Sequence, residues 1–480
     1  SDSLRDQAEL WRWGYLVFGG LVFLCGLSSL GFGVGIPSRR TDESVQSPNP
    51  ISESRRAKPL AWMFLGAIPS SLLLAVTSYI TTDIAPIPLL WVIPLAIYLM
   101  TFILAFSGTF RLPLGFLGRV TVIALTAQTF AMLARATEPM GILLPLHLIT
   151  FFCAALLCHG WVARLRPPSD QLTRFYLCLS LGGVLGGLFN TLLAPLLFHK
   201  LGEVEYPLLL TLVAGFRPSR PFSFRSKDLV GPLLIALIVA IELAISNRWT
   251  GLQDGLKTLS EKTGLRADQV LSACLFGLPL ILIYCLTDSP VRFALGLGAL
   301  FLLGSLTPGP SGETIHLERN SLGVIRVARD ESGRLHRMIH GNTIHGVQRV
   351  GSNAPLSFYH RTGPVGKVFA RVVDDWTGDR TIGMVGLGAG SVASYARPSQ
   401  DWHFLELDPA VERIARDERF FTFLRDSTAR SWHVLLGDAR LRLNEFDDRT
   451  FDLLILDAFS SDAIPIHLLT LEALELYLRK

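Results

Sequence analysis

Residues 381–396 read TIGMVGLGAGSVASYA, an apolar run followed by glycines at alternate positions. The apolar run predicts a β-strand, and the residues after the glycines suit a helix. Gly386, Gly388 and Gly390 let the backbone turn sharply and let a nucleoside approach without a Cβ in the way. Such a glycine pattern is weak evidence when it stands alone, so the residues around it decide its meaning.

Three apolar segments downstream of the glycines each end on an acid. They read WHFLELD with Glu406, HVLLGDA with Asp438, and FDLLILDAFSSDAIP with Asp457. Ligands of open α/β sheets bind outside the carboxyl ends of the strands, so Glu406 is predicted to accept from ribose hydroxyls and Asp438 from an adenine amino group. Each acid alone could simply cap the helix that follows it. The ordered set favours a nucleoside site.

The pattern along the chain predicts four parts. Residues 1–306 are expected to form a polytopic helical membrane domain, and TPGPSG at 307–312 a turn-rich linker. Alternation in GVIRV and RLHRMI, joined by the turn DESG, predicts a small antiparallel β region within 313–360. The strand and helix alternation within 361–480 predicts a Rossmann-like domain with a parallel, doubly wound sheet.

Composition supports a membrane domain, because 50% of the 480 residues are hydrophobic and only 18% are charged. A transmembrane helix needs about 20 apolar residues. Nine segments meet that need and residues 206–216 add a shorter one, which predicts nine or ten helices in a lipid bilayer. The nine segments are 14–36, 60–79, 86–107, 114–134, 140–163, 176–199, 228–246, 269–286 and 289–305.

Charge predicts the orientation of this multi-pass domain in the cell membrane. Basic loops around residues 39–58, 164–174 and 217–227 are typical of the cytoplasmic side. Ten spans would then put the C-terminal domain outside, so we expect one span to be misassigned and the catalytic domain to be cytoplasmic. Within the spans, LGGVLGGLFN predicts close helix packing through its glycines.

Charge and cysteine content argue against a nucleic-acid-binding protein, a disulfide-stabilised protein and a metal-binding protein. A net charge of +4 without a basic stripe argues against a nucleic-acid partner. The six cysteines lie in apolar segments without the spacing of metal ligands, which argues against a disulfide framework and against a metal site. These cysteines are Cys25, Cys153, Cys158, Cys178, Cys274 and Cys285.

The glycine loop, LELD, GDA and LDAFSSD, in this order, resemble the spermidine synthase family of aminopropyltransferases, which have a methyltransferase-type fold. The segments HGNTIHGVQ and LSFYH resemble the family's upstream substrate segments, with Gln348, Tyr359 and His360 as substrate-binding residues. The resemblance covers about residues 313–480. The whole chain is similar to bacterial proteins that fuse a membrane domain to a spermidine synthase-like domain.

The resemblance implies aminopropyl transfer from decarboxylated S-adenosylmethionine to a diamine such as putrescine. Glu406 would then hold the ribose, Asp438 the adenine, and Asp457 would accept the proton of the attacking amine, with Asp462 as a second acid of the polyamine site. Putrescine is charged at pH 7 because alkylamine pKa values lie near that of Lys, about 10.4. A base is therefore needed, whereas a metal is not. A homodimer is an assembly that the resemblance leaves open.

The sequence also departs from the family pattern. The family usually has an Asp in its glycine loop where this chain has Ala389, which leaves open an S-adenosylmethionine-dependent methyltransferase. A transporter with a non-catalytic nucleoside-binding domain and a simple membrane anchor are further alternatives. The sequence ends before the further strands that such a sheet has, so we expect the fold to be truncated at its C-terminal end and parts to be missing at both ends of the chain.

Overall fold

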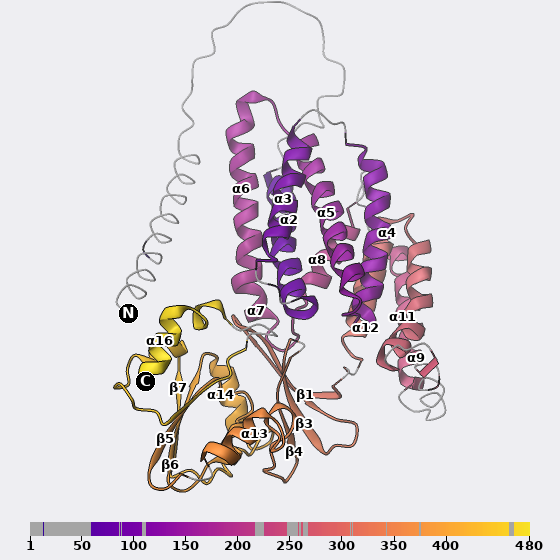
Figure 1. Cartoon of the computed structure of the whole chain (residues 1–480). Helices are drawn as coiled ribbons and strands as arrows, with labels where there is room; N and C mark the ends of the chain where they lie inside the picture. The colour runs from indigo at the N-terminus through magenta and orange to yellow at the C-terminus, as the bar shows by residue number, and fades with distance from the viewer. Residues whose placement is uncertain are drawn as a thin grey trace, which may run out of the picture.

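A helical bundle and two β-sheets make up the protein (Figure 1). The computed structural model describes residue 13 and residues 59–480 except for 86, 88, 108–111, 217–224, 247–257, 259–260, 263–266, 308, 310, 342, 374–375 and 460–464. The predicted span at 14–36 and the basic loop at 39–58 lie outside the described residues.

Helices occupy the other predicted apolar segments. In chain order they are α2 (Pro59–Tyr79), α3 (Val92–Phe106), α4 (Leu114–Leu133), α5 (Met140–Arg164), α6 (Leu172–Leu188), α7 (Ala194–Leu197), α8 (Glu205–Ala214), α9 (Val230–Ser246), α11 (Ala267–Cys285) and α12 (Pro290–Gly304). Two π-helical turns, η2 (Ile80–Ile84) and η4 (Phe189–Leu193), continue α2 and α6.

Within the part of the chain that the structure describes, four helical segments are long and apolar enough to cross a membrane. They are Pro59–Ile84, Leu114–Leu133, Met140–Arg164 and Ser169–Leu197. Val92–Phe106, Glu205–Ala214, Gln269–Cys285 and Pro290–Gly304 are apolar but shorter. The crossing itself and the count of nine or ten spans stay predictions.

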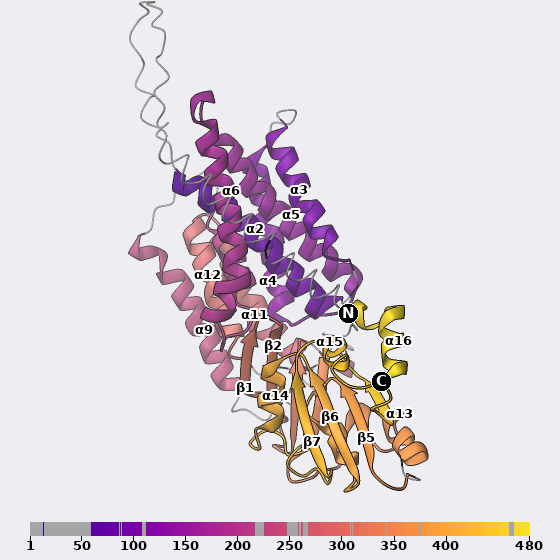
Figure 2. The same cartoon turned by 90° about the vertical axis from the view of Figure 1, so that its left-hand side faces the viewer.

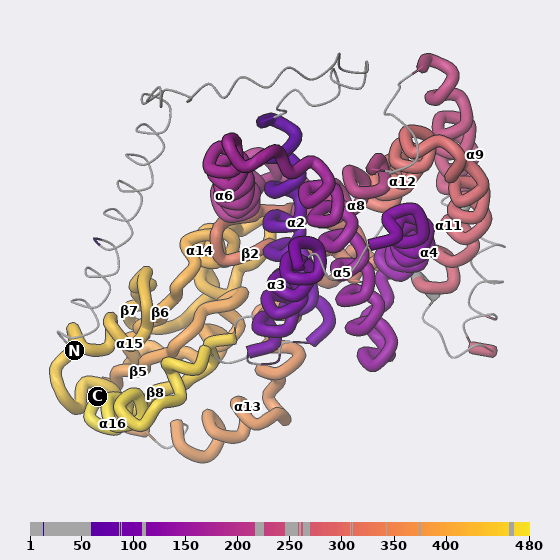
Figure 3. The backbone as a smooth tube through the Cα atoms, turned by 90° about the horizontal axis from the view of Figure 1, so that it is seen from above, coloured from indigo at the N-terminus to yellow at the C-terminus, as the bar shows by residue number. Residues whose placement is uncertain are grey.

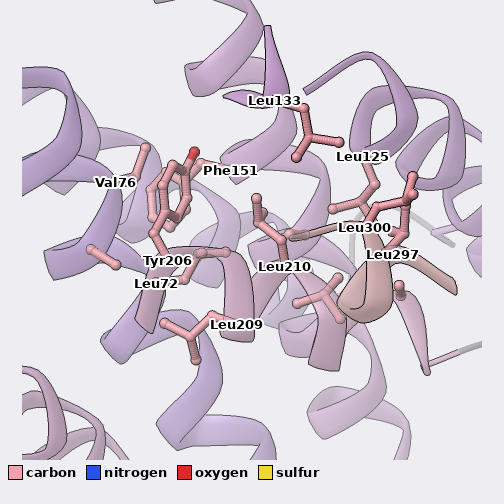
Figure 4. Packing of buried hydrophobic residues seen from close by; sticks show 14 of the residues in the cluster. Leu72, Val76, Leu125, Leu133, Phe151, Tyr206, Leu209, Leu210, Leu297 and Leu300 are labelled. Carbon is pink, nitrogen blue, oxygen red and sulfur yellow. The ribbon is translucent and has the colours of Figure 1, made fainter. Parts of the chain in front are cut away.

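Helices α2 and α6 pack backbone against backbone, as the glycine pattern predicts. A Cβ at Gly182 would collide with the carbonyl of Met63, and one at Gly186 with that of Ala67. Gly183 and Gly187 have open space where a Cβ would stand, so the face of α6 that carries Gly182 and Gly186 makes the contact with α2. Leucine, phenylalanine and tyrosine side chains from α2, α4, α5, α8 and α12 fill the centre of the bundle (Figure 4).

The two sheets differ in topology. The first is antiparallel with the order β1 (Glu313–Asn320), β2 (Gly323–Arg329), β3 (Leu335–His340) and β4 (Thr343–Arg349). The second is parallel with the order β7 (Ser431–Leu436), β6 (Gln400–Glu406), β5 (Arg380–Val385) and β8 (Leu453–Leu456). The chain order reverses between β5 and β8, the place where doubly wound sheets bind ligands.

Short helices complete the C-terminal part. They are α13 (Pro364–Val368), α14 (Pro409–Arg416), α15 (Ala439–Leu443) and α16 (Leu471–Arg479). The run after the glycines is a 3₁₀-helix, η8 (Ser391–Tyr395), where a longer helix was expected. The parallel strands stand side by side below the bundle (Figure 2), and from above they lie to the side of α2 and α6, away from α9 and α11 (Figure 3).

The antiparallel sheet is fixed to the bundle by a buried ion pair. The two guanidinium nitrogens of Arg319, on β1, lie 2.5 and 2.7 Å from the carboxylate oxygens of Glu205, the first residue of α8. The same guanidinium donates to the carbonyl of Gly202, and the Arg319 N–H donates to the carbonyl of His199. Both charged side chains are more than nine-tenths buried, so the pair belongs to the interior of the molecule.

Candidate active site

A cavity of about 460 Å³ lies between the two sheets. Apolar side chains of the antiparallel sheet, among them Ile325 and Met338, form one wall. The carboxyl ends of β5, β6, β7 and β8 form the other wall, because the carboxyl ends of parallel strands meet at one edge of their sheet. Of the predicted residues, the cavity is lined by Gly386, Gly388, Glu406, Asp438, Asp457 and Tyr359.

The glycine loop has room for no side chain at its first two glycines. Gly386 has φ +97° and Gly388 has φ +53°, conformations that favour glycine. A Cβ at Gly386 would collide with the carbonyl of Asp457, and one at Gly388 with the carbonyl of His345. Gly390 also has a positive φ, +79°, but a Cβ there would meet Leu424 and Phe423 on the side away from the cavity.

Glu406 is fixed by the backbone around it. Its carboxylate accepts from the N–H of Leu387 at 3.0 Å and from the N–H of Asp408 at 2.9 Å. Burial raises the pKa of Glu406 above its ordinary value, against the lowering effect of these backbone hydrogen bonds. Each carboxylate oxygen therefore has one partner from the protein and can still accept a hydroxyl from a ligand.

Asp438 combines a structural contact with a place in the cavity wall. One carboxylate oxygen accepts from the N–H of Leu441 and caps α15. The other lies 3.0 Å from Nε2 of His467, which also lines the cavity. Asp438 therefore caps α15 and lines the cavity at the same time.

Asp457 forms a hydrogen bond with Tyr359, which was predicted from the sequence to be a substrate-binding residue. The hydroxyl of Tyr359, within η6 (Ser357–Tyr359), donates to the Asp457 carboxylate. Tyr395 in turn donates its hydroxyl to the carbonyl of Tyr359 at 2.5 Å. Burial raises the pKa of Asp457 above its ordinary value, and the Tyr359 hydrogen bond opposes that rise. The carboxylate can therefore take up a proton more readily than an exposed Asp.

Two of the predicted substrate residues, Gln348 and His360, do not line this cavity. Gln348 is buried, and its side chain bonds to Thr422 and to the carbonyl of Ser352. It lies on the same face of β4 as Gly346, and that face packs against residues 420–422 at Gln348. His360 follows the cavity-lining Tyr359, but its ring bonds to Thr362 and does not line the cavity. Asp462 lies outside the described residues.

Ala389, where the family usually has an Asp, packs into the core. It is fully buried with Ile325 and Met338, and a Cβ at Gly346 would touch it. Its N–H donates to the carbonyl of His345 at 3.3 Å.

Sequence reasoning missed several polar residues in the cavity wall. They are His340, Thr343, His345, Asp408 and His467. Asp408 had a signal, since it stands two residues after Glu406 in LELD. For His340 on β3 and His345 on β4, the sequence offered only the alternation of side chains along a strand. The packing of the sheet decides which of its two faces meets the cavity, and the sequence does not show that packing. Among the described residues, no group of three or more His, Cys, Asp or Glu side chains is placed to hold a metal ion.

Comparison with known proteins gives a partial sequence match. A stretch of the chain is 38% identical over 96 residues to a polyamine aminopropyltransferase of Vibrio vulnificus (strain CMCP6). The match covers 19% of this chain and 30% of that protein, so the chain spans about a third of the length of this curated relative. The relationship supports a transferase of this general kind over the matched stretch.

Two further comparisons concern solved structures and protein-family models. The crystal structure of a probable spermidine synthase from Corynebacterium glutamicum ATCC 13032 aligns with a TM-score of 0.29 and 21% identity, over 36% of this chain and 60% of that one. An alignment at that score carries no argument about the fold or the site. No protein-family model matches the chain.

Proposed function

We propose that the protein is a membrane-fused, spermidine synthase-like aminopropyltransferase. It transfers an aminopropyl group from decarboxylated S-adenosylmethionine to a diamine such as putrescine. The observation that supports it best is Asp457, a half-buried carboxylate bonded to Tyr359 in the cavity that Glu406 and Asp438 also line. The sequence relationship to a polyamine aminopropyltransferase points the same way.

Each residue has a separate task in this reaction. Glu406 binds the ribose and Asp438 the adenine edge, which orients the nucleoside along the strand ends. Asp457 accepts a proton from the acceptor amine, because an amine is nucleophilic only when it is neutral. The nitrogen then forms a bond to the carbon beside the sulfonium, the carbon–sulfur bond breaks, and methylthioadenosine leaves with the electron pair. Tyr359 orients Asp457 and keeps it ionised between turnovers.

The helical bundle keeps this domain at the cytoplasmic face of the inner membrane, where adenosyl compounds and polyamines are present. The antiparallel sheet contributes one wall of the site, and its Arg319 is held by Glu205 of the bundle. The bundle therefore has a role in placing the catalytic domain, and a homodimer is compatible with this arrangement.

A methyltransferase is the second candidate, favoured by Ala389. Without a carboxylate in the glycine loop, nothing there repels the carboxylate of intact S-adenosylmethionine. Such an enzyme would use the same nucleoside site and transfer a methyl group in place of the aminopropyl group.

A product assay on the full-length protein separates the candidates. The protein is incubated with putrescine and either decarboxylated or intact S-adenosylmethionine, and the products are measured by mass spectrometry. Spermidine and methylthioadenosine, lost in Asp457→Asn, support aminopropyl transfer. S-adenosylhomocysteine formed from the intact donor supports a methyltransferase. Absence of all these products, with the nucleosides also failing to bind, contradicts both.

A further inference from the structure

Asp408 has a carboxylate oxygen without a hydrogen-bond partner among the described residues. The residue is only 5% exposed and lines the cavity, yet its Oδ2 makes no hydrogen bond. A buried ionised oxygen in this state is costly unless a ligand or water satisfies it. Glu406, the predicted ribose ligand, stands two residues earlier at the same strand end. The unsatisfied oxygen thus belongs to a cavity-lining residue beside the predicted ribose ligand.

The other oxygen of Asp408 is held by two donors. Its Oδ1 accepts from the N–H of Ala410, which caps α14, and from the side-chain amide of Asn320 at 2.6 Å. Both contacts fall on Oδ1, so they fix the plane of the carboxylate and leave Oδ2 for another group. The side-chain oxygen of Asn320 accepts from the N–H of Leu322, which fixes Asn320 in turn.

Asn320 connects this carboxylate to the bundle. It is the last residue of β1 and follows Arg319 directly, whose guanidinium is bound by Glu205 of α8. A continuous run of contacts thus leads from α8 through Arg319 and Asn320 to Asp408. The Asp408 N–H continues it by donating to Glu406.

We propose that Asp408 is a second ribose-binding carboxylate beside Glu406, and that Asn320 is a positioning residue that aims it from the membrane side. The inference rests on the proposed adenosyl function. It assigns to the bundle an effect on nucleoside affinity, since the position of β1 depends on the Arg319 and Glu205 pair. The ligand group is a ribose hydroxyl, a donor that matches a carboxylate oxygen with free lone pairs.

Two variants test the proposal without removing the helix cap. Asp408→Asn keeps an oxygen for Ala410 and Asn320, and Asn is as good a cap as Asp, but it places an amide N–H₂ where Oδ2 stood. Asn320→Ala removes the donor that orients the carboxylate. The matched control is Arg413→Gln, which breaks the exposed contact of Arg413 with Glu318 between the same two elements, α14 and β1.

Binding is measured by calorimetry on the full-length protein with methylthioadenosine and its 2′-deoxy and 3′-deoxy analogues. Asp408→Asn should weaken methylthioadenosine about tenfold or more, as expected for a lost hydrogen bond to a charged group. It should leave one of the two deoxy analogues bound as tightly as by the wild type, an outcome that a purely structural role does not produce. Asn320→Ala should weaken methylthioadenosine about threefold to tenfold, and Arg413→Gln should not change it.

The link to the bundle is tested by a double-mutant cycle of Glu205→Gln with Asn320→Ala. If the bundle acts through Asn320, the loss of affinity in the double variant is smaller than the product of the single losses. Equal affinity of Asp408→Asn and wild type for methylthioadenosine overturns the inference alone. Failure of the wild type to bind any adenosyl compound overturns the proposed function and this inference together.

Discussion

Buried polar side chains meet different partners in the bundle and in the catalytic part. In the bundle, Thr121, Thr129 and Thr150 each donate to a carbonyl one turn earlier in their own helix. In the catalytic part, Asp408 is buried and Asp457 is half-buried, and both line a cavity. Burial of a polar group is therefore no sign of function unless its remaining hydrogen-bonding capacity is directed at space that a ligand can fill.

The largest expected effect comes from the acid that faces the cavity next to Tyr359. Asp457→Asn removes the proton acceptor while it keeps the shape of the side chain. Turnover of decarboxylated S-adenosylmethionine and putrescine should fall about 10²-fold to 10⁴-fold, the usual contribution of a general base. Methylthioadenosine affinity, measured in parallel, should stay near that of the wild type. Full turnover in the variant would assign the proton to another group.

Glu406→Gln should have the next largest effect, and on binding rather than on chemistry. The amide keeps one acceptor oxygen but loses the charge, and its N–H₂ faces one of the two backbone donors, the N–H of Leu387 or that of Asp408. Methylthioadenosine affinity should drop about tenfold to a hundredfold in calorimetry. Gln400→Glu, which alters a buried polar residue at the far end of the same strand, is the control for general damage to β6.

A change at the contact between α2 and α6 should alter stability and leave catalysis unchanged. Gly186→Ala puts a methyl group against the Ala67 carbonyl, whereas Gly187→Ala puts one in open space. The first should lower the free energy of unfolding by about 1–3 kcal/mol, and the second should leave it equal or raise it. Thermal melting in detergent measures both. Equal melting temperatures would show that α2 and α6 are further apart than described.

The smallest effect concerns pH. The Tyr359 hydroxyl lowers the pKa of Asp457, so Tyr359→Phe should raise that pKa further above its ordinary value. Asp457 acts as a base only when ionised, hence the acidic limb of the kcat/KM profile should move to higher pH. The same experiment on His360→Ala, whose ring bonds to Thr362, should leave the limb where it was.

The sequence predicted the elements better than their contacts. Apolar runs and turn residues indicate the strands, and glycine followed by strand-end acids indicates the cavity, because these features depend on local geometry. Gln348 could not be placed, since a strand offers two faces and the packing of β4 against residues 420–422 selects one. The proposed positioning role of Asn320 could not be predicted from the sequence, because it depends on a hydrogen bond to Asp408, 88 residues away.

The ion pair of Arg319 and Glu205 bears on how such a protein evolves. Each charge is buried, so either one without the other loses its ion-pair partner in the interior, which is destabilising. A substitution at one position is therefore tolerated only with a compensating change at the other. A lineage that separates the two halves would have to lose both charges, and we expect the two positions to change together among relatives.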